Sequence, residues 1–541
     1  MKKWKILTSE TVKSEDDVIK TLIAERNFDE SFLHPRLSNL TIEKSGIDKK
    51  ELQKAIIRIQ EAIKKNEKIV ILGDYDVDGI CASAILWETI YKKYKNIFPY
   101  IPDRFSEGYG ISEKTLENIL EKYPDVKLII TVDNGIVAVG PVEIAKEKGI
   151  DVVITDHHVA GELLPDAYAI VHTTYFCGAG VAWMLARELG FEDDEAMQEK
   201  LELACLATIA DLVPLTDLNR VIVIFGLEYL RKTRRPGLQE LYKSAGIESE
   251  KISEYHIGHV IGPRINASGR VFHAIESLRL LCTNDKRYAE KTAQHLESTN
   301  KKRQQMVSDS VQHAKLTVLQ KDFGKIIGVS HKTYSEGVVG LISSRLVEEY
   351  YRPAFAISAG ETVSKGSARS IHGVNIIELL RSVSHLLIEL GGHPMAAGFS
   401  LETAKIGDFF VALEEKLIGI DEEIFQKTLD IDMELPVEII TKSLYKRLQK
   451  LSPFGIANRE PIFATREIFV KDIRFLGKDK SHLKLKIEKS GEKFDAIGFG
   501  LAQKYELRVG GKINIAYTLS LNEWRNAETL QFIVKDIIVL D

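Results

Sequence analysis

The sequence has few of the features that mark membrane, secreted or fibrous proteins. No apolar run approaches the roughly 18 residues of a membrane span, and we expect no contact with membranes. Its four cysteines, Cys81, Cys177, Cys205 and Cys282, form no C-x-x-C pair. A zinc site or a disulfide framework is therefore not indicated, and a reducing cytoplasm is expected. Gly and Pro are not abundant, no repeat is visible, and the basic start lacks the apolar stretch of a signal peptide.

The chain also lacks an excess of positive charge. It carries 73 Lys and Arg against 78 Asp and Glu, which gives a net charge of −5. Any contact with nucleic acid must then come from local basic patches. The 541 residues, 44% hydrophobic and 28% charged, suit a globular protein of about three or four domains.

Short apolar runs alternate with helical patterns from about residue 67. Strands are predicted at 68–72, 126–132 and 151–155, and helices at 80–94 and 142–148. Continuous apolar strands that alternate with helices indicate a parallel sheet covered on both faces. We assign residues 67–220 to this first α/β domain and expect residues 1–66 to pack on it.

Three further regions follow the first domain. Residues 221–320 are mostly helical and end in a long polar connector helix from Lys286 to Gln320. A second α/β domain is predicted at 321–425. Residues 426–541 contain apolar runs of period two separated by turn residues, which predicts an all-β domain, a small barrel.

Charged side chains follow each predicted strand of the first domain. In an open parallel sheet the carboxyl ends of the strands line one crevice, where ligands bind. Taken singly, each Asp is more often a helix N-cap or a turn residue, but their occurrence at three successive strand ends favours a common site. They are Asp74, Asp76 and Asp78 after the first strand, Asp133 after the second, and Asp156, His157 and His158 after the third.

So many carboxylates in one crevice would repel one another unless cations were bound. Oxygen ligands with an added imidazole suit Mn²⁺ or Mg²⁺. Asp211, a lone charge after an apolar helical stretch, is a further candidate. The number of ligands exceeds what one ion needs, so we predict two ions that share a carboxylate, an arrangement typical of phosphoryl hydrolysis.

The segments Asp74–Gly79, Val132–Gly135, Asp156–His158 and Ala210–Asp211 resemble the four motifs of the DHH phosphoesterases. Within that superfamily the chain is similar to the RecJ single-strand-specific exonucleases. The signatures that carry this resemblance are Glu107–Gly110, Gly262–Arg270, Glu336–Gly340, Gly366–Ser370 and Gly391–Gly398.

The resemblance implies a DHH domain, a connector helix, a second (DHH-associated) α/β domain and an OB-fold-like domain, in that order. It implies 5′-to-3′ degradation of single-stranded DNA to mononucleotides with Mn²⁺ or Mg²⁺, in DNA repair and recombination. It also implies a monomer with a single-strand-binding protein or a helicase as partner. The implied metal ligands are Asp74, Asp76, Asp78, Asp133, His157 and Asp211, with Asp133 as the bridge.

Two other residues receive roles from the same resemblance. Asp156 would orient a histidine, and His158 would face the scissile phosphate. One position departs from the superfamily pattern: Leu72 stands where many members have a metal-ligating His. We expect one metal site to rely more on Asp74 or on water.

Several side chains and a glycine-rich turn are candidates for substrate binding. Arginine has a fixed charge and a forked shape that suit phosphate, and glycine lets a backbone approach it. A surface or ion-pair role for each arginine, and a plain tight turn for Gly391-Gly392-His393, remain alternatives. The candidates are Arg104, Arg264, Asn266, Arg270, Ser367, Arg369, Ser370, Gly392 and His393.

Aromatic and basic residues outside these motifs are open to two interpretations. Tyr109 and Phe105 would either pack under a base or belong to the core. In the all-β domain, a mildly basic set would either bind the incoming strand or form a solvated sheet face. That set is Arg474, Phe475, Lys478, Lys480, Lys484 and Arg525.

Two other functions fit part of the pattern. A DHH phosphodiesterase or pyrophosphatase that acts on short RNA or cyclic dinucleotides would use the same metal site. The long connector, the β domain and the Gly262–Arg270 segment favour a polymer instead. A non-enzymatic replication scaffold similar to Cdc45 should have lost carboxylates, and this chain keeps the set except at position 72.

Overall fold

The computed structural model describes residues 2–8, 10, 12–104, 106–271, 273–320, 324–524 and 527–540. The side chains of residues 30, 270, 271, 523, 524 and 527 also lie outside the description. The chain forms two compact units, residues 36–425 and residues 1–35 with 426–541. No helix of the described residues is both long and apolar enough to cross a membrane.

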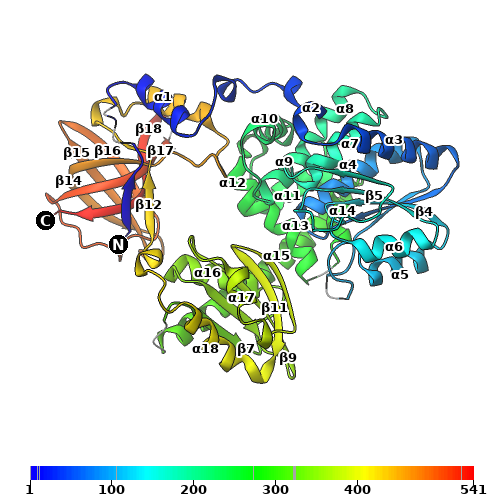
Figure 1. Ribbon diagram of the computed structural model, residues 1–541. Helices are drawn as coiled ribbons and strands as arrows, with labels where there is room; N and C mark the ends of the chain where they lie inside the picture. The colour runs from blue at the N-terminus through cyan, green and yellow to red at the C-terminus, as the bar shows by residue number, and fades with distance from the viewer. Residues whose placement is uncertain are drawn as a thin grey trace. The chain divides into compact units, whose positions relative to one another are not determined.

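A five-stranded parallel sheet forms the centre of the first α/β domain (Figure 1). The strands lie in the order β3-β2-β4-β5-β6, and every neighbouring pair is parallel. The order reverses between β2 and β4, which places a ligand-binding crevice at their carboxyl ends. The strands are β2 (Lys68–Gly73), β3 (Ile97–Tyr100), β4 (Val126–Val132), β5 (Asp151–Asp156) and β6 (Ala169–His172).

Helices cover both faces of this sheet, as the continuous apolar strands predict. On β2, Ile69 and Ile71 belong to one buried cluster, whereas Val70 and Leu72 belong to another on the opposite face. The first face carries α3 (Lys49–Lys64), α4 (Val77–Lys93) and α7 (Gly178–Glu188), and the second α5 (Glu113–Lys122) and α6 (Val139–Glu147).

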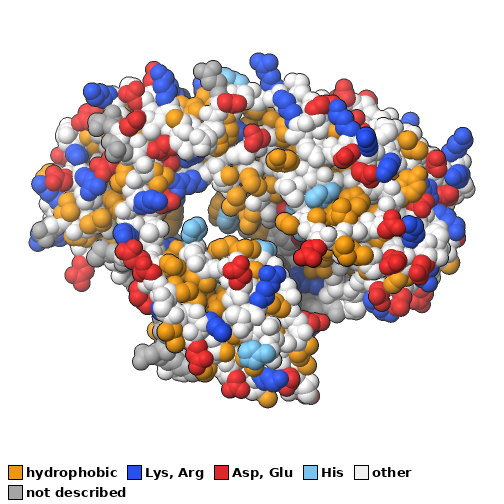
Figure 2. Space-filling model, viewed as in Figure 1, with side chains coloured by type: hydrophobic (Ala, Val, Ile, Leu, Met, Phe, Trp, Pro, Cys, Tyr) orange, Lys and Arg blue, Asp and Glu red, His pale blue; other side chains and the backbone are white. Residues whose placement is uncertain are grey.

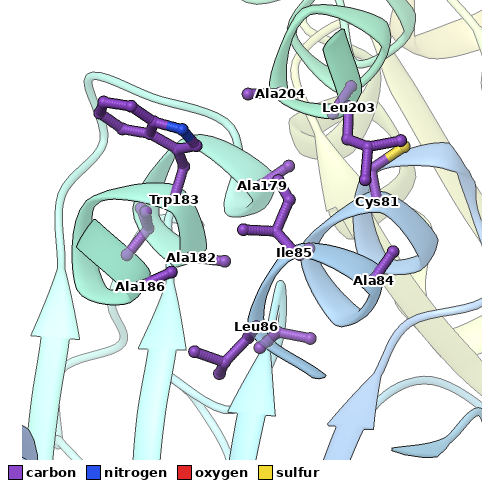
Figure 3. Packing of buried hydrophobic residues seen from close by; sticks show 14 of the residues in the cluster. Cys81, Ala84, Ile85, Leu86, Ala179, Ala182, Trp183, Ala186, Leu203 and Ala204 are labelled. Atoms are coloured by element: carbon purple, nitrogen blue, oxygen red, sulfur yellow. The ribbon is translucent and has the colours of Figure 1, made fainter. Parts of the chain in front are cut away.

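Small side chains allow the helices around α4 to pack closely (Figure 3). Ala179 and Ala182 of α7 are completely buried beside Ile85 of α4, and Ala84 and Cys81 of α4 lie in the same cluster. Cys81, Cys177 and Cys205 are buried and free, and burial raises the pKa of each thiol. They are core residues with little thiolate character.

Helices fill the stretch between the two α/β domains. The long connector is α15 (Lys286–Leu319), capped by Asp285, whose side chain accepts hydrogen bonds from the backbone of Arg287 and Tyr288. The others in this stretch are α10 (Asp217–Arg231), α11 (Pro236–Ala245), α12 (Glu254–His256), the π-helix η4 (Ile257–Ile261), α13 (Gly262–Val271) and α14 (Ile275–Cys282). Before the parallel sheet comes α2 (Ile42–Ser45), and α8 (Asp194–Glu199) and α9 (Leu201–Ala210) belong to the first α/β domain.

The second α/β domain is a mixed five-stranded sheet. Its order is β10-β11-β9-β8-β7; only β7 and β8 are parallel. The strands are β7 (Ile327–His331), β8 (Ala354–Ser358), β9 (Val363–Arg369), β10 (Glu389–His393) and β11 (Ala396–Glu402), and the helices are α16 (Val339–Tyr350), α17 (Ile376–Arg381) and α18 (Ile406–Lys416).

The terminal unit contains a closed five-stranded barrel. The strand order β14-β15-β16-β18-β17 closes because β14 also pairs with β17, which is the arrangement of an OB-fold. The elements are β12 (Thr428–Ile431), β13 (Met433–Glu434), α19 (Lys442–Leu448), β14 (Phe463–Leu476), β15 (His482–Lys489), β16 (Glu492–Gly498), β17 (Lys512–Trp524) and β18 (Ala527–Val539).

The N-terminal segment requires a correction. The expectation that residues 1–66 pack on the first α/β domain is wrong for residues 1–35, which belong to the unit of the barrel. There β1 (Lys3–Ile6) pairs in parallel with β12, and α1 (Glu15–Glu25) buries Val18 and Leu22 in the barrel's core cluster. The apolar side chains of α1 pack against core residues that lie more than 400 positions later in the sequence. No local sequence pattern predicts such a contact.

Candidate metal centre and phosphate cleft

The carboxylates expected at the strand ends do meet at one edge of the parallel sheet. Asp76 caps α4, and its Oδ1 accepts hydrogen bonds from the backbone N–H groups of Asp78 and Gly79. Asp133 follows β4 with a φ of 63°, a left-handed conformation that Asp adopts more readily than most residues. Such backbone conformations cluster at functional sites.

His157 lies at the centre of this crevice. Its Nε2 is 3.1 Å from Asp133 Oδ1, 3.6 Å from Asp78 Oδ2 and 3.7 Å from Asp211 Oδ2. Asp211 directly follows α9, so four separate segments of the chain contribute to the cluster. These distances let one imidazole and several carboxylates share a cation.

Three groups of side chains among the described residues bring their ligand atoms within 4.8 Å of one another. Asp133 and His157 each belong to two of the groups. A carboxylate common to two groups is what two neighbouring ions require. The groups are Asp133–His157–His158, Asp78–His157–Asp211 and Asp74–Asp76–Asp133.

The donor atoms fit divalent cations. Asp74 Oδ1, Asp133 Oδ1 and His157 Nε2 are buried and make no hydrogen bond within the described part of the chain. Burial, followed by the charge of neighbouring carboxylates, raises the pKa of Asp74 and Asp133 well above the usual carboxyl range and that of Asp211 to about 8. Buried polar atoms without partners are rare, and cations would relieve both the missing contacts and the repulsion.

Asp78 is held by the first residues of α7. Its Oδ2 accepts a hydrogen bond from Gly178 N at 2.6 Å and its Oδ1 one from Ala179 N at 2.7 Å. A helix N-terminus favours negative charge, so this contact fixes a carboxylate in the cluster. The glycine is needed for space, because a β-carbon on Gly178 would lie 2.5 Å from Asp133 Cβ.

We therefore expect Gly178→Ala to reduce kcat/KM by about 100-fold, since a displacement of about 1 Å at a reacting centre costs that much. Gly140→Ala is the matched control: Gly140 lies in the first turn of α6 and has open space where a β-carbon would be. Steady-state kinetics on both variants, with thermal melting as the folding check, measure the effect. Equal activity of the two variants would show that the contact with Asp133 does not position the cluster.

Asp156 orients His158. Its Oδ1 lies 2.8 Å from His158 Nδ1, and its Oδ2 accepts a hydrogen bond from Ile136 N at 2.9 Å. Burial lowers the pKa of His158, but the hydrogen bond and charge of Asp156 outweigh it and raise that pKa to about 9. Tyr109 OH donates to the carbonyl of Asp133 at 2.9 Å and also approaches the His158 ring. Tyr109 is thus part of the site rather than of the core.

Leu72 belongs to the core and not to the cluster. Its side chain is completely buried among the residues under α5 and α6. Its carbonyl oxygen accepts a hydrogen bond from Asn134 Nδ2, whose own Oδ1 accepts one from Ile111 N. Asp74 has a carboxylate oxygen close to those of Asp76 and Asp133, in a group that could hold a cation.

Three of the predicted substrate residues line one cleft of about 510 Å³: Arg104, Ser367 and Arg369. Arg369 Nη1 donates to Ser367 Oγ at 3.0 Å, and no carboxylate of the described residues pairs with this guanidinium. Burial lowers the pKa of Arg369. Gly340 leaves the space in front of it open, because a β-carbon there would lie 3.1 Å from Arg369 Nη2. The cleft suits an anionic group.

The other predicted substrate residues lie elsewhere. Arg264 is bound to Glu297, with 2.6 Å between Nε and Oε2, and Asn266 Oδ1 accepts a hydrogen bond from Val77 N in the first turn of α4. Ser370 is buried and donates to Val374 O. These three have structural partners that short motifs do not reveal. The side chain of Arg270, as well as Phe105, lies outside the described residues.

The glycine-rich turn is a strand, which corrects our expectation. Gly391, Gly392 and His393 form the end of the edge strand β10 and pair with β11 on one side, so part of their backbone groups are used in the sheet. Gly392 and His393 are exposed, but Gly391 is the one that lines the cleft.

Sequence reasoning assigned no individual role to several residues that shape the site. Most of them contribute a backbone group or the absence of a side chain. Gly178, Ala179, Asn134 and Gly340 act through a backbone N–H, an amide or an absent side chain. The run Cys177-Gly178-Ala179-Gly180 at the start of a helix was a usable signal, because glycine-rich helix starts commonly bind anions.

The barrel surface has exposed aromatic side chains near basic ones. Phe475 is 52% exposed, and Lys471 and Lys512 lie over the ring of Phe469. Arg474 pairs with Asp472, and Arg525 lies outside the described residues. Lys and Arg side chains are mixed with Asp and Glu on the molecular face in Figure 2, so the basic character is local.

Family models match three parts of the chain. Residues 68–210 match the DHH family N-terminal domain, residues 317–419 the DHHA1 domain, and residues 431–536 the RecJ OB domain. The three matches fall on the two α/β domains and the barrel.

Relatives match almost the whole chain. The single-stranded-DNA-specific exonuclease RecJ of Bacillus subtilis is 38% identical over 96% of this chain and 68% of its own. That of Haemophilus influenzae is 32% identical over 91% of each. Among solved structures, RecJ of Thermus thermophilus in complex with Mn²⁺ has a TM-score of 0.84 and 26% identity, over 99% of this chain and 79% of that one. The two α/β domains and the barrel thus match this group in order and extent, and the chain belongs to the RecJ family of single-stranded-DNA-specific exonucleases.

Proposed function

We propose that this protein removes mononucleotides from the 5′ end of single-stranded DNA, with two divalent cations, in DNA repair and recombination. The observation that carries the proposal is the set of three ligand groups, two of which share Asp133 and two of which share His157, in a chain of the RecJ family. Mn²⁺ and Mg²⁺ are both suitable, since the donors are carboxylate oxygens and imidazole.

The proposed ligands are Asp74, Asp76, Asp78, Asp133, His157 and Asp211, and Asp133 is the proposed bridge. When bound, two such ions activate a water molecule and stabilise the attacking and leaving oxygens of the phosphate. Asp78 is held in place by the backbone N–H groups of α7, and Asp156 keeps Nδ1 of His158 occupied. His158 Nε2 lies 3.2 Å from Tyr109 OH, and it would turn from this hydroxyl to donate to an oxygen of the scissile phosphate.

The 5′ end is proposed to bind in the cleft of Arg104, Ser367 and Arg369. A terminal phosphate carries more charge than an internal one and has three free oxygens, which suits converging guanidinium and hydroxyl donors. Binding of that end fixes which phosphodiester lies at the metal centre. Degradation would then start from one end only.

Arg369→Gln is expected to reduce kcat/KM on strands with a 5′-phosphate by about 10- to 100-fold, the usual cost of a lost hydrogen bond to a charged group. On strands with a 5′-hydroxyl the reduction should be smaller, so the preference between the two substrates should shrink. Arg381→Gln, at an exposed position of α17 in the same domain, is the control. An unchanged preference in the Arg369 variant would remove this residue from the end-binding site.

The function itself is tested with single strands that carry a radioactive label in the 5′-phosphate or at the 3′ end. We expect the 5′ label to appear first as a mononucleotide, with Mn²⁺ or Mg²⁺ but not with EDTA. The 3′-labelled strand should shorten gradually. Early release of the 3′ label, or equal activity with EDTA, would refute the proposal. Parallel reactions with RNA trinucleotides and cyclic dinucleotides test the alternative function, a phosphodiesterase that acts on short RNA or cyclic dinucleotides.

Further parts of the proposal concern the setting of the reaction. We propose a monomer that acts in the cytoplasm and receives its strands from a single-strand-binding protein or a helicase. The four free cysteines support a reducing compartment. Light scattering on the purified chain checks the monomer.

A further inference from the structure

One side of the connector helix α15 carries polar side chains that lack some of their hydrogen-bond or ion-pair partners among the described residues. Its first half packs against α13 and its second half against α16, so it passes from the first α/β domain into the second (Figure 1). Glu297, Asn300 and Arg303 are spaced three residues apart on this helix, which places them along one side.

Arg303 has no acidic partner among the described residues. Its Nε and Nη2 donate to the same atom, Asn300 Oδ1, at 3.2 and 2.9 Å. No carboxylate of the residues that the structure describes lies within ion-pair distance of its guanidinium. A half-buried arginine is normally paired, because a charge removed from water without a partner is costly.

Asn300 has an unused donor beside this arginine. The residue is completely buried, and its Nδ2 has no acceptor in the described part of the chain. Asn300 Nδ2 is therefore a buried donor for which the described residues supply no oxygen. Of the Arg303 guanidinium, Nε and Nη2 are bound to Asn300 Oδ1, and only Nη1 has no acceptor among the described residues. Unsatisfied buried donors cost about 1–3 kcal/mol each, and a native site that retains them calls for a ligand.

Two other arginines make the surroundings more positive. Burial first, then the charges of Arg264 and Arg345, lower the pKa of Arg303. The nearby acids are already paired: Glu297 with Arg264 and Lys301, and Glu348 with Arg345. Positive charge therefore predominates around Arg303, at the joint between α13, α15 and α16.

We propose that Arg303 and Asn300, with Arg264 and Arg345 around them, form a subsite for a phosphate group of the single strand, separate from the cleft of Arg104, Ser367 and Arg369. The planar guanidinium and the amide present several N–H donors, which match the oxygens of a phosphodiester. This inference rests on the proposed function, since it assigns the phosphate to the DNA substrate.

The test compares Arg303→Gln with Arg287→Gln, an exposed arginine in the first turn of the same helix. Wild-type protein is first shown to degrade single strands with Mn²⁺, because failure there concerns the proposed function and not this site. Binding of a fluorescent oligothymidylate is then measured with EDTA at several salt concentrations. For Arg303→Gln we expect affinity to fall about tenfold and the slope of log K against log salt to decrease by about 0.7, as for one lost phosphate contact on a single strand.

If Arg303 and Asn300 only stabilise the fold, their substitution should change the unfolding temperature but not the salt dependence of DNA binding. Arg303→Gln removes the donors to Asn300 Oδ1, and Asn300→Leu removes their acceptor, so either variant should unfold at a somewhat lower temperature than the wild type. The salt slope therefore separates phosphate binding from a purely structural role. Arg303→Lys should restore part of the affinity. A lower unfolding temperature with an unchanged salt slope would overturn the inference.

A second arm identifies the source of the phosphate. If the site takes the strand, deoxyadenosine 5′-monophosphate or inorganic phosphate should inhibit the wild type and Arg303→Gln equally. Weaker inhibition of the variant, together with unchanged oligothymidylate binding, would mean that the site takes a released product, and would overturn the assignment to the strand.

Discussion

Replacement of Asp133 by Asn is expected to reduce kcat/KM on single-stranded DNA by well over 100-fold. Asp133 belongs to two of the three ligand groups, so its carboxylate is the proposed bridge between two ions. Loss of a residue that only supports a metal ligand already costs about 10- to 100-fold, and loss of a shared ligand should cost more. Quantitative digestion of a labelled strand at saturating Mn²⁺ measures the effect.

Asparagine is chosen because the backbone of Asp133 is left-handed, with φ at 63°, which Asn also tolerates. The substitution thus removes charge without a change of shape. Asp166→Asn serves as control, since that side chain is 76% exposed in the same domain. Activity of the Asp133 variant close to that of the control would exclude a bridging carboxylate at this position.

Removal of divalent cations should abolish activity completely and also lower the thermal stability of the unit formed by residues 36–425. Several carboxylates lie close together there, and burial raises the pKa of Asp74 and Asp133. A cation that binds only the folded state at 100 times its Kd stabilises it by about 2.7 kcal/mol. Calorimetry with EDTA, and after addition of Mn²⁺ or Mg²⁺, tests both effects.

The Asp133→Asn variant provides the control for this experiment. Its unfolding temperature should rise less on addition of Mn²⁺ than that of the wild type, because one shared ligand is missing. Full activity in EDTA, or an equal upward shift of the unfolding temperature in both proteins, would show that the cluster is not the site of the functional ions.

The parallel sheet and its carboxylates were predictable because they depend on short segments. The strands predicted at 68–72, 126–132 and 151–155 match β2, β4 and β5 to within one residue, since each is continuously apolar. The helix after β2 starts at Val77, three residues earlier than predicted. The helix starts earlier because Asp76 caps it. Asp76 is also a proposed metal ligand, and a residue that fills both roles is difficult to recognise as a cap from sequence.

Contacts between distant segments could not be predicted in the same way. Nothing in the Gly262–Arg270 motif indicates that Arg264 pairs with Glu297 on another helix. The support of Asp78 comes from backbone N–H groups 100 and 101 residues later, and residue types say little about such groups. In contrast, Arg104, Ser367 and Arg369 do line one cleft, as their common proposed role required.

The pairing of β1 with β12 has a consequence for synthesis. Residues 36–425 are inserted between the two parts of the terminal unit, so β1 leaves the ribosome long before β12 and cannot pair with it until residue 428 has been made. The inserted unit can therefore fold while translation continues, whereas the barrel has to wait for the last strands. A polypeptide released early, before β12, would carry an unpaired strand edge, which is a recognised cause of aggregation.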